Sequence, residues 1–124
     1  MSFKTLIAYQ KSFNLAMEVF TISKKFPSDE KFALTSQIVR SSRRVCSAIA
    51  EAYRKRDYVK HFKSKLTDAD SENSETQLWF DFALACNYIS NDDHSKLHAK
   101  SEEVGKLLNY MINNPEKFGC SKTI

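Results

Sequence analysis

Apolar residues recur at steps of three and four through almost the whole chain, which is the spacing of one face of an α-helix. In the first such stretch the recurring positions are Leu6, Tyr9, Phe13, Ala16 and Phe20. The pattern predicts a helix over residues 3–26, which ends at Pro27 because proline has no N–H for the helical ladder. Ser28 or Asp29 then offers a side-chain oxygen that can cap a second helix.

Three further stretches repeat this pattern and predict helices over residues 30–54, 57–89 and 93–113. The stripe of the second helix is Leu34, Ile38, Val45, Ile49 and Tyr53. The stripe of the third is Val59, Phe62, Leu66, Ala69, Asn73, Thr76, Phe80 and Ala83. The stripe of the fourth is Leu97, Val104, Leu107, Leu108, Met111 and Ile112.

The segments between these stretches have the composition of short connections. Arg54 to Asp57 contains no apolar residue, and Ser90 to Asp93 is turn chemistry in which one side chain should cap the fourth helix. Pro115 closes that helix, and residues 117–124 are predicted to be a loose tail. Because short connections force neighbouring helices antiparallel, we predict a single all-α domain over residues 1–124. Its expected architecture is an up-down-up-down antiparallel four-helix bundle.

Composition supports this prediction. The 124 residues include only two glycines and two prolines, and 42% are hydrophobic, which is near the globular average and argues against a disordered chain. The three cysteines, Cys46, Cys86 and Cys120, form no C-x-x-C pair, and we expect free thiols without a redox or metal role. No signal-peptide pattern and no run of about 20 apolar residues is present, so we expect a cytoplasmic protein with no membrane partner.

Two parts of the pattern carry more apolar surface than one bundle face needs. Around Leu78, Trp79 and Phe82 apolar residues cover nearly the whole helix circumference, and residues 3–26 are similarly broad. Large apolar patches on soluble proteins usually mark contacts, so we predict that these three residues form an oligomer interface. The alternative is a deeper core or a slightly twisted stripe.

Charge is unevenly distributed along the third predicted helix. Six basic residues and His61 lie between Arg54 and Lys65 against the single acid Asp57, whereas residues 68–81 contain five acids and no base. A basic end of this kind can neutralise phosphates, which predicts binding of RNA or DNA. The alternatives are a solvated junction, or basic ends that meet acidic segments of neighbouring subunits. The candidate nucleic-acid-binding residues are Arg43, Arg44, Arg54, Lys55, Arg56, Lys60 and Lys63.

Other residue clusters do not form a convincing catalytic or metal site. His94, His98 and Glu102 fall on one helix face, but no Glu-x-x-His motif accompanies them, so we expect a solvated face. Asn73 and Thr76 interrupt an apolar stripe, and they either fix the helix register or line a buried ligand pocket. We therefore expect no enzymatic activity, no cofactor and no metal.

The segment from Phe26 to Ala52 is distinctive. It contains Phe26-Pro27, then Leu34-Thr35-Ser36-Gln37, an Arg-rich helical stretch and finally Ala48-Ile49-Ala50-Glu51-Ala52. These residues resemble the bacterial four-helix-bundle protein family, also called the ribosomal S23 or 23S rRNA intervening-sequence protein family. The stretch Glu75-Thr76-Gln77-Leu78-Trp79-Phe80 is similar to a patch of one branch, and the resemblance covers about residues 3–112.

The resemblance implies a homopentamer of four-helix bundles with no catalytic residues, and relatives that serve retroelements as accessory proteins bind nucleic acid and a reverse transcriptase. Ala48 and Ala52 stand where the family pattern has Asn and Gly, so a function that needs those two residues is not carried over. We expect a non-enzymatic homo-oligomer that binds RNA through the junction of its second and third helices. The alternative is a scaffold that binds a protein partner through the aromatic surface around Trp79.

Overall fold

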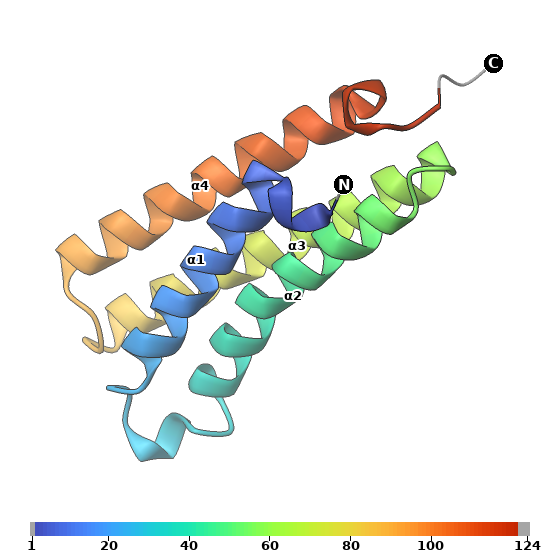
Figure 1. Cartoon of the computed structure of the whole chain (residues 1–124). Coiled ribbons are helices and arrows are strands. Elements are labelled where there is room, and N and C mark those ends of the chain that lie inside the picture. The colour runs from blue at the N-terminus through green and yellow to red at the C-terminus, as the bar shows by residue number, and fades with distance from the viewer. Residues whose placement is uncertain (1, 122–124) are drawn as a thin grey trace.

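The computed structural model describes residues 2–121, and four long α-helices account for most of them. Their bounds are α1 (Ile7–Ser23), α2 (Leu34–Arg54), α3 (Val59–Ala85) and α4 (Asn91–Asn113). Three short 3-10 helices flank them: η1 (Phe3–Thr5), η2 (Ser28–Glu30) and η3 (Pro115–Phe118). The helices lie lengthwise beside one another, and consecutive helices run in opposite directions (Figure 1). The predicted all-α, up-down-up-down bundle is confirmed, with no strand in the described part of the chain.

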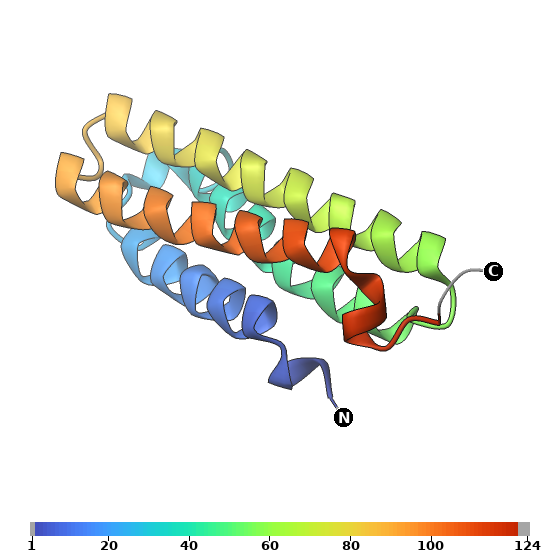
Figure 2. The ribbon, with the colours of Figure 1, turned by 90° about the horizontal axis from the view of Figure 1, so that it is seen from above.

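The four helices pack in a ring. Helix α2 lies between α1 and α3, and α4 closes the ring by packing against the same two helices (Figure 2). The α2–α3 connection lies at one end of the bundle, where η1 packs against α2 and η3 packs against α3 and α4. The α1–α2 and α3–α4 connections lie at the opposite end (Figure 1).

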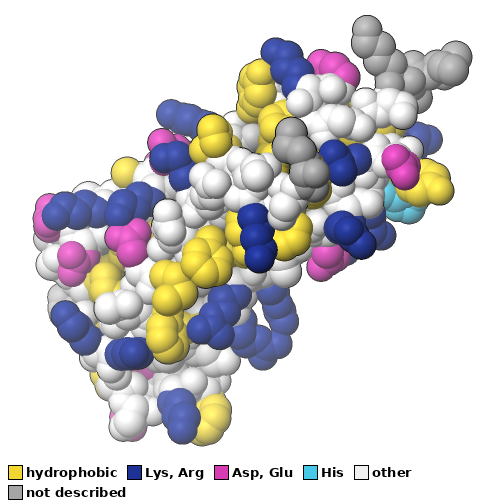
Figure 3. Space-filling view, in the orientation of Figure 1, with side chains coloured by type: hydrophobic (Ala, Val, Ile, Leu, Met, Phe, Trp, Pro, Cys, Tyr) yellow, Lys and Arg dark blue, Asp and Glu magenta, His cyan; other side chains and the backbone are white. Residues whose placement is uncertain are grey.

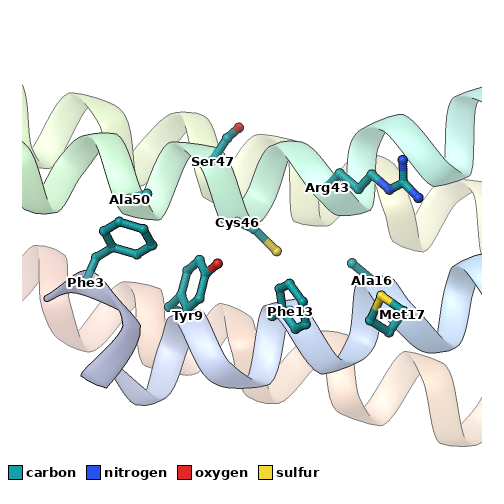
Figure 4. Close-up of a pocket in the computed structure, with 9 residues that line it drawn as sticks. All are labelled: Phe3, Tyr9, Phe13, Ala16, Met17, Arg43, Cys46, Ser47 and Ala50. Atoms are coloured by element: carbon teal, nitrogen blue, oxygen red, sulfur yellow. The ribbon is translucent and has the colours of Figure 1, made fainter.

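The first helix begins later and ends earlier than its pattern predicted. Leu6 is extended (φ −68°, ψ 130°) and separates η1 from α1. The η1 turn is held by the Ser2 hydroxyl, which accepts a hydrogen bond from the Lys4 amide at 3.1 Å. The Thr5 hydroxyl adds a bond to the Ser2 carbonyl at 2.8 Å. This break directs Phe3 toward α2 instead of along the axis of α1 (Figure 4).

The other helix ends show which capping predictions were correct. Ser28 and Asp29 do not cap α2: its N-cap residue is Ala33, which makes no side-chain cap hydrogen bond, and the Leu34 amide donates to Glu30 Oε1 at 3.2 Å. Helix α3 ends at Ala85, four residues before the predicted end, and Asn87 takes a left-handed conformation (φ 62°), which Asn tolerates better than most residues. The capping of α4 by the Ser90 segment is confirmed, because the Ser90 hydroxyl accepts from the Asp93 amide at 3.0 Å.

The predicted loose tail differs from the structure over its described part. Residues Pro115–Phe118 form η3, and Gly119 has φ 95°, a left-handed conformation that glycine adopts without strain. This turn brings Cys120 back into the bundle, where its side chain is buried against the core. Residues 122–124 lie outside the described residues.

The core consists of two apolar clusters. The cluster nearer the α2–α3 end is centred on Phe62, Leu66 and Leu108, and the other contains Val19 and Phe80. Buried polar side chains fall between the two clusters: Ser12, Ser41, Ser42, Asn73, Thr76 and Ser101. All four helices contribute to this polar layer.

Hydrogen bonds join the polar layer across helices. The hydroxyls of Ser41 and Thr76 are 2.8 Å apart and connect α2 to α3. Asn73 connects α3 to α4, because its Nδ2 donates to the Ser101 carbonyl and its Oδ1 accepts from the Ser101 hydroxyl, both at 2.9 Å. Of the two roles proposed for Asn73 and Thr76, this pairing favours register over a ligand pocket.

The predicted core stripe of the first helix was wrong in part. Phe13 is 46% exposed, and Tyr9 and Phe20 are half-buried. The buried positions of α1 are instead Ala8, Ser12, Leu15, Ala16, Val19 and Ser23. Apolar residues occupy several sides of this helix, and the side that packs against the other helices is the one with smaller side chains. As a result, an aromatic row lies on the outer surface beside α2.

Candidate functional site

The basic cluster predicted between the second and third helices forms the α2–α3 end of the bundle. Helix α2 stops at Arg54, and a tight turn follows in which the Tyr58 amide donates to the Lys55 carbonyl at 3.0 Å. Helix α3 starts at Val59, so the cations of the turn and those of the first turns of α3 are held close together. We call this surface the basic end; its residues are Arg54, Lys55, Tyr58, Lys60, His61 and Lys63.

The four cations of the basic end are available to a ligand. All four are exposed, and none forms an ion pair with any residue between 2 and 121. Tyr58 is 66% exposed and packs edge-on against His61, with 5.8 Å between ring centroids. Exposed cations beside an exposed ring can contact both a phosphate backbone and a base.

Arg56, predicted to belong to this cluster, makes contacts within the protein itself. Its Nε donates to the Tyr53 carbonyl at 2.7 Å, and its guanidinium lies 3.7 Å from the centroid of the Tyr53 ring. An added Cβ on Gly119 would meet its Nη1 at 2.9 Å. Arg56 therefore holds the end of α2 against the turn after η3, and it offers a ligand less freedom than its neighbours in sequence.

Arg44, a further predicted binding residue, lies apart from the basic end. It precedes Arg54 by ten residues, which is about 15 Å along a helix. It lines a polar groove between α2 and α3 together with Glu51, Lys65 and Glu72. Burial and nearby Glu75 raise the pKa of the Glu72 carboxyl, and the charge of Arg44 opposes this shift. Arg44 therefore lies among carboxylates, whose negative charge makes this groove a poor place for a phosphate.

Arg43 faces the opposite flank of α2. Its guanidinium lies 5.2 Å from the centroid of the Phe20 ring on α1. It also borders a groove between α1 and α2 with a volume of about 420 Å³, which we call the α1–α2 groove (Figure 4). The groove is lined by Phe3, Tyr9, Phe13, Ala16, Met17, Arg43, Cys46, Ser47 and Ala50. Figure 3 shows hydrophobic side chains gathered along this face with basic side chains beside them.

This groove was missed by sequence reasoning. The signal for it was present, because the apolar surface of residues 3–26 is broader than one stripe. Without a partner helix in view, that surplus could not be assigned to a concave surface. The groove brings together Phe3 and Ala50, which are far apart in the sequence.

The three predicted interface residues form a second apolar surface on α3. Leu78 is 47% exposed and Phe82 is 50% exposed, and the Trp79 ring centroid lies 5.8 Å from that of Phe82. Trp79 and Phe82 line a hollow of about 300 Å³ between the start of α2 and the end of α3. The indole Nε1 of Trp79 is buried and has no hydrogen-bond partner. We call Leu78, Trp79 and Phe82 the Trp79 patch.

The histidines lie on α4 and pair with carboxylates. His94 Nε2 is 2.8 Å from Asp81 Oδ1 on α3, and His98 Nδ1 is 2.9 Å from Glu102 Oε1. Over residues 2–121 no group of three or more His, Cys, Asp or Glu side chains is arranged to hold a metal ion. Among the helices that these residues form, none combines the length and the apolarity that crossing a membrane requires.

A four-helix bundle with a basic end and two apolar outer surfaces is the class of protein that this geometry defines. The family described as 23S rRNA-intervening sequence protein matches residues 4–110. The chain belongs to this family, which confirms the resemblance seen in the sequence.

A solved structure supports the same assignment. The chain is similar to the crystal structure of a protein of unknown function from the S23 ribosomal protein family of Bacteroides thetaiotaomicron. The two share 27% sequence identity and superpose with a TM-score of 0.79 over 86% of this chain and 96% of the other. A comparison with curated proteins found no match.

Proposed function

We propose that this protein is a non-enzymatic, homo-oligomeric helical bundle that binds RNA through its basic end. One observation carries the proposal: Arg54, Lys55, Lys60 and Lys63 are exposed beside Tyr58, and no carboxylate among the described residues pairs with them. Several lysines elsewhere on the molecule are paired, as Lys11 is with Glu103 at 3.0 Å and Lys65 with Glu51 at 2.9 Å.

Electrostatics gives this arrangement its binding energy. Each cation that meets a phosphate releases a condensed counterion, so affinity falls steeply as salt rises. The net charge of +4 adds a weak general attraction for a polyanion. The family description refers to an intervening sequence of 23S rRNA, which supports RNA as the first target to test. In an oligomer, a pentamer by the family resemblance, each copy adds a basic end and avidity rises.

The test removes three charges from the basic end. We expect Lys55→Gln/Lys60→Gln/Lys63→Gln to bind a labelled RNA more weakly than the wild type in a polarisation titration. The slope of log affinity against log salt should become shallower by about 2, because each lost phosphate contact contributes about 0.7 on a single strand. The matched control, Lys24→Gln/Lys25→Gln/Lys31→Gln, removes three exposed lysines at the opposite end and should change binding little. Equal losses in the two variants, or no binding by the wild type at low salt, would refute the proposal.

The Trp79 patch supports the oligomeric part of the proposal. Two side chains about half exposed, a hollow beside them and an unpaired buried indole N–H together form a surface that a second protein surface can cover. We expect Leu78→Ser/Phe82→Ser to lower the molar mass measured by light scattering after gel filtration. A matched change on α1, Ile7→Ser, which replaces a side chain that is 58% exposed, should leave the mass unchanged.

The scaffold alternative uses the same patch and gives a different result. If the wild type is strictly monomeric and nevertheless retains a protein from lysate after nuclease treatment, and the Leu78→Ser/Phe82→Ser variant does not, the patch binds a protein partner instead of a second copy. A monomer that retains no partner would refute both interpretations of the Trp79 patch.

A further inference from the structure

The α1–α2 groove contains a row of aromatic rings that follows α1. Phe3 and Tyr9 are in edge-on contact at 4.9 Å between centroids, and Tyr9 and Phe13 follow at 6.0 Å. Phe13 is 46% exposed and the neighbouring Met17 is 48% exposed, so this row is open to solvent. In Figure 4 the rings of Phe3, Tyr9 and Phe13 lie across the groove from Ala50 and Cys46 on α2, and Arg43 lies further along α2, beyond Phe13. Rings spaced in this way form a surface on which flat groups can stack.

The charge around this row is of one sign. None of the residues that line the groove is acidic, and Arg43 is exposed at its border. Helices α1 and α2 have one acid each, and both point away from the groove. Glu18 pairs with Lys100 on α4, and Glu51 pairs with Lys65 on α3. A polyanion can therefore enter the groove without meeting a carboxylate.

The groove is continuous with the basic end. A smaller hollow of about 220 Å³ is lined by Ser2, Phe3, Tyr53, Arg54 and Arg56, so Phe3 borders both hollows. Arg54 belongs at the same time to the basic end. From Arg54 to Arg43 is eleven residues, or about 16 Å along α2, which corresponds to about five stacked nucleotides at about 3.4 Å each.

We propose that the α1–α2 groove is the path of single-stranded nucleic acid, in which bases stack on Tyr9 and Phe13 while Arg43 and Arg54 hold the backbone. This inference rests on the proposed function and names its substrate class. Bases in a duplex are stacked on one another and cannot reach a row of protein rings, whereas unpaired bases can. The groove therefore selects single strands over duplexes, and the basic end alone contributes affinity for both.

The test compares one exposed ring inside the groove with one outside it. Phe13→Leu keeps the apolar side chain and removes the ring, Phe13→Tyr keeps the ring, and Phe32→Leu removes an exposed ring at the opposite end of the bundle, outside the groove and the Trp79 patch. Each variant is titrated against a labelled single-stranded RNA and against the duplex of the same sequence at constant salt. We expect Phe13→Leu to weaken single-strand binding about five- to tenfold and to leave duplex binding unchanged. Phe13→Tyr and Phe32→Leu should bind both ligands as the wild type does.

A photo-crosslinking experiment on the wild type gives a readout that does not depend on the variants. A single strand with 4-thiouridine should attach to peptides that contain Tyr9 or Phe13, as identified by mass spectrometry. Crosslinks confined to the basic end, or wild-type binding that is as strong for the duplex, would overturn the groove path and leave the proposed function intact. If the wild type binds neither ligand, the proposed function itself fails. If Phe13→Leu lowers the molar mass without changing RNA affinity, a second copy covers the groove and the inference is wrong.

Discussion

Asn73 is the side chain whose removal tests the packing most directly. It is 3% exposed at the middle of α3, and it makes two hydrogen bonds of 2.9 Å to Ser101 on α4. Asn73→Ala deletes both bonds and leaves the Ser101 hydroxyl without its acceptor, although that hydroxyl still accepts from Gln77 Nε2. Each lost bond costs about 1 kcal/mol, and the unsatisfied hydroxyl adds about 1 kcal/mol, so we expect a loss of about 3 kcal/mol.

The assay is urea unfolding followed by circular dichroism, with the free energy of unfolding extrapolated to water. Asn109→Ala on the exposed side of α4 is the matched control and should change stability by less than about 0.5 kcal/mol. Combining Asn73→Ala with Ser101→Ala should cost less than the sum of the two single changes, with a coupling of about 1–2 kcal/mol. Additive effects, or a loss for Asn73→Ala as small as that for Asn109→Ala, would refute the reasoning that this pair joins α3 to α4.

Three further predictions concern the turn after η3, the interior of α4 and the opposite end of the bundle. Gly119→Ala should destabilise the protein by about 1–2 kcal/mol, since its φ of 95° is left-handed and its Cβ would meet Arg56 at 2.9 Å. Gly105 lies inside α4, where an added Cβ would make ordinary contacts, so Gly105→Ala should instead stabilise the protein by up to about 1 kcal/mol. Thermal unfolding of the two variants beside the wild type measures both effects. The hydrogen bond from Tyr88 to Glu30 raises the pKa of Tyr88 to about 12. Because the neutral phenol makes this bond, its stabilisation is present below pH about 10 and is lost as the pH rises through about 12. Tyr88→Phe should thus be less stable than the wild type at pH 8 but not above pH 12, as urea midpoints measured across this range would show.

Much of the fold could be predicted because helix formation depends on local spacing. The stripe residues predicted for α2, such as Ile38 and Ile49, are buried in the structure, and so are Phe62 and Leu66 of α3. The predictions failed where a contact distant in sequence decides the backbone. The first amide of α2, that of Leu34, donates to Glu30, a carboxylate that also accepts from Tyr88, and no local pattern distinguishes Glu30 from Ser28 or Asp29.

The candidate site was predictable in its charge and not in its geometry. The cations of the basic end lie close together in the sequence, between Arg54 and Lys63, so their clustering could be predicted from the charge pattern. Arg43 and Arg44 are neighbours in sequence, but successive side chains of a helix point about 100° apart, so the two line different grooves. Arg56 lies among the same cations, but its guanidinium packs against the Tyr53 ring, a contact that charge patterning does not reveal.

Local patterns in the chain were enough to predict the four long helices, the positions of their connections, the polar interruption of the core and the basic end. Each of these depends on residues within a few turns of one another. Packing between the helices, in contrast, determines which side of α1 is buried and places Phe3, Tyr9 and Phe13 in a groove against α2. A helix with apolar residues on several faces has no local preference among them, because the free energy of burial depends on the shape of the partner that covers each face.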